Sequence, residues 1–190
     1  MTRPFAILTI FLGLISTTLY ARENISYWVQ NTEIDTLRDP NHFYFLSDIP
    51  IRAVGQLILT DSIKPSDNFV TFSLMDTISK CNHTDLKFFL LVFEKIMESA
   101  DGALSEAVGS YSSYFIEKRP KVFIKHLDTI DKKSIEKWAN FTFYELYFTY
   151  SENELKIQCE ELVENLKKIE KTENLNYFEK QIEENLKNEL

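Results

Sequence analysis

The sequence predicts an all-α fold, an array of about seven to eight helices, and three observations lead to this prediction. Apolar residues recur three or four positions apart in one segment after another. Short polar joints with capping residues separate these segments. The chain of 190 residues contains only 4 Gly and 5 Pro, too few for the turns of a β-sandwich or for glycine-rich phosphate loops.

The chain before residue 60 contains one clear helix signal. Ser47 or Asp48 can cap a helix that has Pro50 in its first turn and ends near Thr60. The apolar residues of this segment share one helical face. Residues 22–46 are the least clear part of the sequence, and we assign them no element.

The next two helices are predicted over residues 66–99. Ser66 caps the first, which runs to residue 80, and Thr84 or Asp85 begins the second, which runs to residue 99. The centre of the second helix, residues 88–93, is apolar on every side. We therefore expect this helix to be buried on all sides.

Three more helices are predicted between residues 101 and 150. The first, over residues 103–117, is rich in small residues that let neighbouring helices approach closely. Pro120 begins the second, which ends near residue 130, and Asp131 caps the third. Residues 141–150 are rich in aromatic residues and Thr, which also suit a strand. We favour a helix there, because the stretch continues the preceding helical face.

The C-terminal segment is acidic and has the clearest apolar pattern. After Ser151, apolar residues step by four and three as in a heptad seam, and the pattern resumes after a break near Thr172. Two short seams favour a helical hairpin packed on the body, with Leu162 and Leu166 buried against it. The alternative is an interface with another chain. The seams are Leu155, Cys159, Leu162, Leu166 and Ile169, and then Leu175, Phe178, Ile182 and Leu186.

Successive helices with short joints suggest stacked helical hairpins. Residues 118–127 resemble the turn and second helix of a HEAT-type repeat. No period repeats residue for residue along the chain, so the resemblance covers about one unit. It implies a HEAT-like array of stacked helical hairpins.

Residues 1–21 have the order of a secretory signal peptide. Arg3 supplies a positive charge, an apolar run follows, and Ala21 ends a short polar stretch. The apolar run is shorter than the roughly 20 residues that a membrane-spanning helix requires. We therefore expect a cleaved signal, a helical body over residues 22–150 and a C-terminal hairpin over residues 151–190 in the same domain. The mature protein is expected in the periplasm or outside the cell, without a membrane anchor.

An alternative destination is the lumen of the endoplasmic reticulum. The last four residues, Lys187 to Leu190, resemble the Lys-Asp-Glu-Leu retention signal. Sequons at Asn24, Asn82 and Asn140 fit N-glycosylation, but the composition gives about as many by chance. The sequence therefore leaves the secretory route open.

Export bears on the two cysteines of the chain, Cys81 and Cys159. Oxidising compartments favour a disulfide between them. The alternative is a pair of buried thiols, because free Cys packs as a small hydrophobic residue. Both interpretations stay open at the level of the sequence.

The charge and the motifs exclude several function classes. The formal net charge of −8 argues against a nucleic-acid partner, because nucleic-acid binding requires a positive face on the protein.

The motifs of common catalytic and metal sites are missing from the sequence. His42, His83 and His126 stand in no zinc-binding spacing, and no Gly-x-Ser-x-Gly motif occurs. An acidic line along one predicted helix is interpreted as a solvated face rather than a cation site. We predict no cofactor, no metal site and no catalytic residue. The acidic line consists of Glu94, Glu98 and Asp101.

Aromatic residues make up 14% of the chain, and they supply the candidate binding residues. Trp138, Tyr144 and Tyr147 belong to a cluster that suits stacking on a peptide or a sugar, with a buried core as the alternative. We expect a non-catalytic exported protein that binds another protein or peptide through a groove between helices. The alternative is an exported enzyme whose site is assembled from scattered acidic residues, Cys and His.

Overall fold

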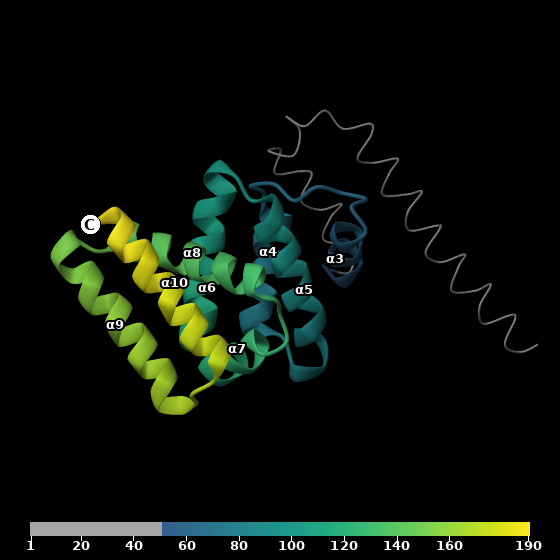
Figure 1. Cartoon of the computed structure of the whole chain (residues 1–190). Helices are drawn as coiled ribbons and strands as arrows, with labels where there is room; N and C mark the ends of the chain where they lie inside the picture. The colour runs from purple at the N-terminus through teal and green to yellow at the C-terminus, as the bar shows by residue number, and fades with distance from the viewer. Residues whose placement is uncertain (1–50) are drawn as a thin grey trace, which may run out of the picture. The chain divides into compact units, whose positions relative to one another are not determined.

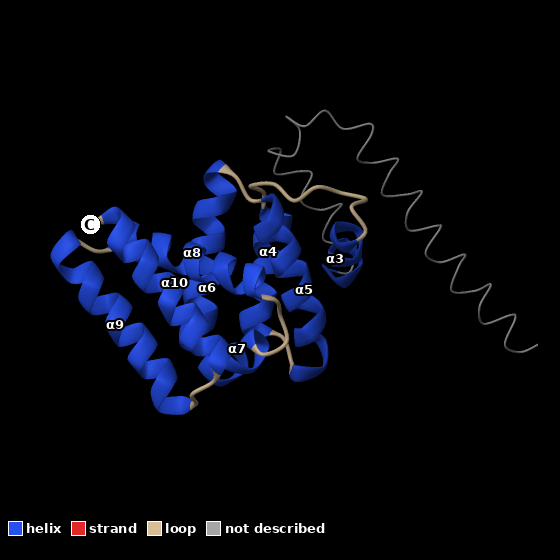
Figure 2. Cartoon of the chain, viewed as in Figure 1, coloured by secondary structure: helices blue, strands red, loops and turns tan. Residues whose placement is uncertain are grey.

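The structure is a computed structural model that describes residues 51–190. This part of the chain forms eight α-helices and no strand (Figure 2), which confirms the all-α prediction. Contacts divide the chain into two units, Met1–Ile63 and Lys64–Leu190. The expected signal peptide, the predicted caps Ser47 and Asp48, and residues 22–46 lie outside the described residues.

The described part of the first unit contains helix α3 (Ile51–Leu59). Its end agrees with the helix predicted to stop near residue 60. Asp61 follows with φ of 54°, in the left-handed region that Asp tolerates better than most residues with a side chain. The Ser62 N–H donates to the Leu57 carbonyl at 2.8 Å, which closes the turn after the helix.

The second unit begins with α4 (Phe69–Lys80). Its cap is Asn68, whose Oδ1 accepts a hydrogen bond from the Thr71 N–H at 2.9 Å. The predicted cap, Ser66, is therefore wrong. Ser66 Oγ instead accepts from Asn68 Nδ2 at 2.7 Å, so it holds the capping side chain in place.

Helix α5 (His83–Ser99) also has an asparagine cap. Asn82 Oδ1 accepts from the Asp85 N–H at 3.1 Å, so the predicted caps Thr84 and Asp85 lie inside the first turn. The expectation that the centre of α5 is buried on all sides is also wrong. Leu91 is 45% exposed, although its neighbours Leu90 and Val92 are buried.

Arg119 alone separates α6 (Gly102–Lys118) from α7 (Pro120–Leu127). Pro120 occupies the first turn of α7, as predicted, because its missing N–H has no helical partner there. The Arg119 guanidinium donates to the Cys81 carbonyl at 2.6 Å. This bond fixes the α6–α7 corner to the end of α4.

Helix α8 (Lys132–Thr149) contains the segment for which the sequence allowed either a helix or a strand. Asp131 caps it, as predicted, and accepts from the Ser134 N–H at 2.7 Å. The helix continues through residues 141–149, which confirms the helical interpretation. Burial of one face against neighbouring helices outweighs the strand preference of its aromatic residues.

The C-terminal segment forms a helical hairpin of α9 (Glu152–Ile169) and α10 (Glu173–Glu189). Ser151 and Glu154 form a capping box at the start of α9. Thr172, where the sequence predicts a break, caps α10 and accepts from the Leu175 N–H at 3.1 Å.

The second unit is a two-layer stack of helical hairpins (Figure 1). In one layer α6 contacts α4 on one side and α8 on the other, and α8 in turn contacts α10. Helices α5, α7 and α9 follow α4, α6 and α8 in the sequence, and each pairs with the helix before it to form a hairpin. In that second layer, α7 contacts α9. The arrangement agrees with the stacked hairpins that the sequence suggests.

Trp138 of α8 lies at the centre of the core and is fully buried. The centroids of its ring system lie 5.1 Å from Phe93, 5.8 Å from Phe115 and 5.3 Å from Phe123. Phe178 of α10 packs edge-on against Phe123 at 5.2 Å. Burial of one such side chain contributes about 1.5–3 kcal/mol, so this cluster ties together five helices.

The buried face of α9 differs from the predicted heptad seam. Leu166 is buried, as expected, but Leu162 is only partly buried, and Val163 takes its place. Since α9 contacts α7, α8 and α10, this face packs on the rest of the unit. The buried residues of α9 are Leu155, Cys159, Val163 and Leu166.

Within residues 51–190, no helix combines the length and the hydrophobicity that crossing a membrane requires.

Candidate functional site

Two grooves between helices are the candidate binding sites in the second unit. The first lies between α6 and α8 and has a volume of about 580 Å³. The second lies between α9 and α10 and has a volume of about 490 Å³. Both volumes fall in the range of pockets that hold ligands. We call them the α6–α8 groove and the α9–α10 groove.

Small residues of α6 bring α6 and α8 close together beneath the α6–α8 groove. A Cβ atom on Gly109 would lie 3.1 Å from the Phe141 carbonyl oxygen of α8, so the helix approach depends on glycine. Ser110 Oγ donates to Glu145 Oε2 at 2.8 Å, which joins the two walls of the groove. The lining residues are Ser105, Glu106, Gly109 and Ser110 of α6, and Phe141, Tyr144, Glu145, Phe148 and Thr149 of α8.

Aromatic side chains at the end of α8 form an exposed ledge beside this groove, and we call Tyr144, Tyr147 and Phe148 the aromatic ledge. Tyr144 and Phe148 stand one helical turn apart with stacked rings and centroids 6.4 Å apart. Tyr147 meets Phe148 edge-on at 5.5 Å. Phe148 is 74% exposed and Tyr144 is 44% exposed, so the ledge offers apolar surface to solvent.

The structure separates the three aromatic residues that the sequence singled out. Tyr144 lines the α6–α8 groove, and Tyr147 contacts its neighbour Phe148 on the ledge. Trp138 points away from both and is fully buried in the core, so the buried-core alternative applies to this residue and it is not a surface binding residue. Phe148, the most exposed ring, belongs to the same predicted cluster but was not singled out, although its i+4 spacing from Tyr144 is a signal in the sequence.

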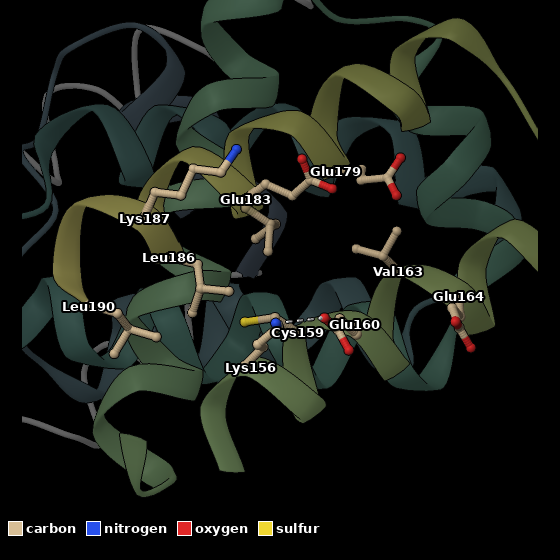
Figure 3. Close-up of a pocket in the computed structure, with 11 residues that line it drawn as sticks. Lys156, Cys159, Glu160, Val163, Glu164, Glu179, Glu183, Leu186, Lys187 and Leu190 are labelled. Carbon is tan, nitrogen blue, oxygen red and sulfur yellow. Dashed lines mark ion pairs between the residues drawn. The ribbon is translucent and has the colours of Figure 1, made fainter. Parts of the chain in front are cut away.

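The α9–α10 groove has an apolar floor between two charged rims (Figure 3). Glu160 and Glu164 stand on the α9 rim, and Glu179 and Glu183 stand on the α10 rim. The floor consists of Cys159, Val163, Ile182, Leu186 and Leu190. Sequence reasoning missed this groove, although the i, i+4 spacing of the glutamates on both helices is visible in the sequence.

Cys159 lies at the base of the α9–α10 groove as a buried free thiol. Burial, with a smaller contribution from the charge of Glu160, raises the pKa of Cys159 to about 11. The thiol is therefore protonated near neutral pH and is a poor nucleophile there.

Cys81 is the second free thiol and lies at the end of α4 beside Arg119. Helix α4 packs on α5 and α6, whereas α9, which carries Cys159, packs on α7, α8 and α10. The structure thus holds the two cysteines apart as thiols, and the disulfide considered from the sequence is not formed in it.

The predicted acidic line is not continuous on one helix: Glu94 and Glu98 lie on α5 and have local partners, whereas Asp101 is the N-cap residue of α6. Glu94 Oε1 lies 2.9 Å from His126 Nε2 of α7. Glu98 pairs with Lys95 at 3.6 Å and with Lys137 of α8 at 3.4 Å. Among the residues that the structure describes, no group of three or more His, Cys, Asp or Glu side chains is placed to hold a metal ion.

Comparisons with known proteins give no indication of function, so the function is inferred from the two grooves. The chain matches no model of a protein family, no curated protein and no solved structure at a significant level.

Proposed function

We propose that this chain is a non-catalytic, exported helical protein that binds a segment of another protein or a peptide in the α6–α8 groove. The observation that carries the proposal is the exposed aromatic ledge beside a groove of about 580 Å³. Phe148 exposes 74% of its surface there. Exposed aromatic clusters beside a pocket are typical of protein interaction sites.

The rings of the ledge supply the affinity in this proposal. Tyr144 and Phe148 lie next to each other on successive turns of α8, so an aliphatic or aromatic side chain can pack against both. Each ring has only two rotatable side-chain bonds, and packing against Tyr147 restricts Phe148 further. Little conformational entropy is lost when a partner binds such rings.

The polar lining sets the chemistry of the partner. Glu106 and Glu145 are the charged lining residues, and both are acidic. Ser105 and Ser110 add hydroxyl groups at the same wall. The groove therefore suits a peptide that carries an apolar anchor next to a Lys or Arg side chain.

Export is part of the same proposal and rests on the predicted signal in residues 1–21. Intact mass spectrometry of the protein purified from its host tests it. We expect a chain that begins near Arg22. A soluble protein that retains Met1 would contradict export and would leave the groove proposal standing.

Selection from a displayed library of random peptides tests the groove. We expect enriched peptides to combine an aromatic or aliphatic residue with Lys or Arg. Phe148→Ser and Tyr144→Ser should each weaken binding of a selected peptide about tenfold or more, which corresponds to about 1.4 kcal/mol.

Tyr114→Ser is the matched control, because Tyr114 is an exposed ring of α6 outside the groove lining. This control should bind the selected peptide as the unaltered protein does. Selected peptides whose affinity falls equally in all three variants, or in none, would contradict the proposal.

A further inference from the structure

We propose that the α9–α10 groove binds a basic amphipathic helix of another protein. The apolar stripe of that helix would lie on the groove floor, and its Lys and Arg side chains would meet the glutamates of both rims. The groove shares no lining residue with the α6–α8 groove. The inference is therefore independent of the function proposed above.

The floor has the length of a helical binding stripe. Ile182, Leu186 and Leu190 follow each other at four-residue intervals along α10, which corresponds to about 12 Å of helix. Cys159 and Val163 of α9 lie opposite them. A bound helix with apolar residues at i, i+4 and i+7 spans about the same length.

The exposure of the floor increases toward one end. Ile182 is buried, Leu186 is partly buried, and Leu190 is 55% exposed. The accessible apolar surface therefore lies on the outer turns of α10, within reach of an added helix. A helix that covers Leu186 and Leu190 would remove this surface from water.

The rims carry negative charge on both sides of this floor (Figure 3). Glu160 has an ion pair at 3.9 Å with Lys156, and Glu179 has one with Lys167. Glu164 and Glu183 form no ion pair within the described chain and lie on opposite rims. Two unpaired carboxylates across an apolar floor complement a helix with cations on both flanks of its apolar stripe.

The distribution of charge also predicts the direction of the bound helix. Lys156 on the α9 rim and Lys187 on the α10 rim lie toward one end of the groove, and Glu164 and Glu179 lie toward the other (Figure 3). The N-terminus of a helix carries a partial positive charge and the C-terminus a partial negative charge. The bound helix should therefore point its N-terminus toward Glu164 and its C-terminus toward Lys187.

The net charge of the chain favours a basic helix over two other possible occupants of the groove. A second copy of the chain has a formal charge of −8, so its approach to a groove lined with glutamates is opposed by repulsion. An anionic lipid surface is opposed for the same reason. A basic helix is attracted.

The probe is a synthetic peptide of Leu and Lys, about four turns long, with all leucines on one helical face. We expect saturable binding by fluorescence anisotropy and induction of helix in the peptide by circular dichroism. The charge reversal Glu164→Lys with Glu183→Lys should weaken binding by about tenfold or more. Leu190→Gln should also weaken binding, and it leaves the buried part of the floor intact.

Two matched controls separate groove binding from general charge attraction. Glu161→Lys with Glu189→Lys changes the net charge equally at residues outside the groove lining, and it should alter binding less than threefold. A peptide of the same composition with its leucines spread around the helix should bind at least tenfold more weakly. Equal losses in both charge variants, or equal binding of both peptides, would overturn the proposal.

A spin label on the peptide tests the direction of binding. With the label at the C-terminus of the peptide, the amide signals of Leu186 and Lys187 should broaden in NMR spectra. With the label at the N-terminus, the signals of Glu164 and Glu179 should broaden. Broadening confined to residues of the α6–α8 groove would overturn the assignment of the site. Dimerisation of the chain that depends on Glu164 and Glu183 would overturn the choice of occupant.

Discussion

His126 Nε2 lies 2.9 Å from Glu94 Oε1, and this contact joins α7 to α5 inside the second unit. Both side chains are largely shielded from solvent. The His126 ring also meets Trp138 edge-on, with centroids 5.9 Å apart, and Thr129 Oγ1 lies 3.4 Å from its Nδ1. A polar pair thus borders the aromatic core at the joint between two helices.

Loss of one partner in this pair should destabilise the fold. Glu94→Ala leaves a ring nitrogen of His126 without its partner, and we expect a loss of about 1–3 kcal/mol in the free energy of unfolding. Glu94→Gln keeps a hydrogen-bonding group in reach and should lose less. Urea denaturation measures both values.

Glu98→Ala serves as the control for that experiment. Glu98 stands one turn later on α5 and makes only exposed ion pairs, so its removal should change the free energy of unfolding by less than about 1 kcal/mol. Equal losses for Glu94→Ala and Glu98→Ala would show that the Glu94–His126 contact adds nothing to stability.

Helix spacing in the sequence was enough to predict the array, because apolar faces at intervals of three and four residues must be buried somewhere. The exact capping residue could not be predicted where two capping residues lie close together. Ser66 and Asn68 both suit a cap, and the hydrogen bond from the Thr71 N–H to Asn68 decides between them. That bond depends on where the first turn begins, which no local pattern specifies.

The buried face of α9 is set by its neighbours and not by the heptad pattern alone. The difference between 3.5 and 3.6 residues per turn rotates a position by only about 20° per heptad, whereas Leu162 and Val163 lie about 100° apart around the helix. Helix α9 contacts α7, α8 and α10, and these contacts bury the side of the seam that carries Cys159 and Val163. Leu162 therefore turns partly outward.

This difference predicts unequal costs for two neighbouring leucines. Leu166→Ala should lower the free energy of unfolding by about 2–5 kcal/mol, because it removes a buried side chain and leaves a cavity. Leu162→Ala should cost less than half as much. Thermal unfolding at two widely separated protein concentrations measures both. A drop that depends on concentration would instead place this face of α9 at an interface between chains.

The candidate sites were harder to predict than the fold, because they depend on which way each face of a helix points. Trp138 and Tyr147 are nine residues apart on α8, so they face opposite directions, and Tyr144 points about 120° away from Trp138. The sequence showed one aromatic cluster, whereas packing divides it into a buried ring and an exposed ledge. The α9–α10 groove exists only because two helices meet, and neither helix alone indicates it.

Gly109 should tolerate no larger residue without a cost in stability. In an isolated helix, Gly109→Ala would gain up to about 1 kcal/mol from higher helix propensity. Here the added Cβ would lie 3.1 Å from a backbone oxygen of α8, and overpacking of this kind costs about 1–3 kcal/mol. We therefore expect a net loss in urea denaturation.

Ser110→Ala is the neighbouring control for Gly109→Ala. Ser110 is exposed, and its replacement removes only the bond to Glu145, so the loss should stay near 0.5–1.5 kcal/mol. A gain in stability on Gly109→Ala would show that α6 and α8 can separate freely at this point. Peptide binding in the α6–α8 groove should then be remeasured with that variant.

The two thiols should react at different rates in the folded protein. With a pKa of about 11, Cys159 has about one thiolate per thousand molecules at pH 8, and burial adds steric protection. Cys81 is only partly buried and should be labelled first by an aromatic disulfide reagent. Labelling of the Cys81→Ser and Cys159→Ser variants assigns each kinetic phase of the reaction to one thiol. In denaturant without reductant both thiols should titrate, and a count of zero would show that the oxidised protein forms the disulfide instead.

The raised pKa of Cys159 also predicts how stability changes in alkaline solution. In the unfolded chain the pKa of this thiol is near its ordinary value of 9.0, and in the folded protein it is about 11. Below pH 9 both states hold the proton, so the full contribution to stability is present. Between pH 9 and pH 11 the unfolded state releases the proton first, and the free energy of unfolding should fall by on the order of 2 kcal/mol.

Cys159→Ala lacks this titration, although its cavity lowers stability at every pH. The difference in free energy of unfolding between the unaltered protein and Cys159→Ala should therefore shrink from pH 8.5 to pH 10.5, because Lys and Tyr titrations are common to both proteins and cancel. A difference that stays constant over this range would show that Cys159 is ionised as readily in the folded protein as in the unfolded chain.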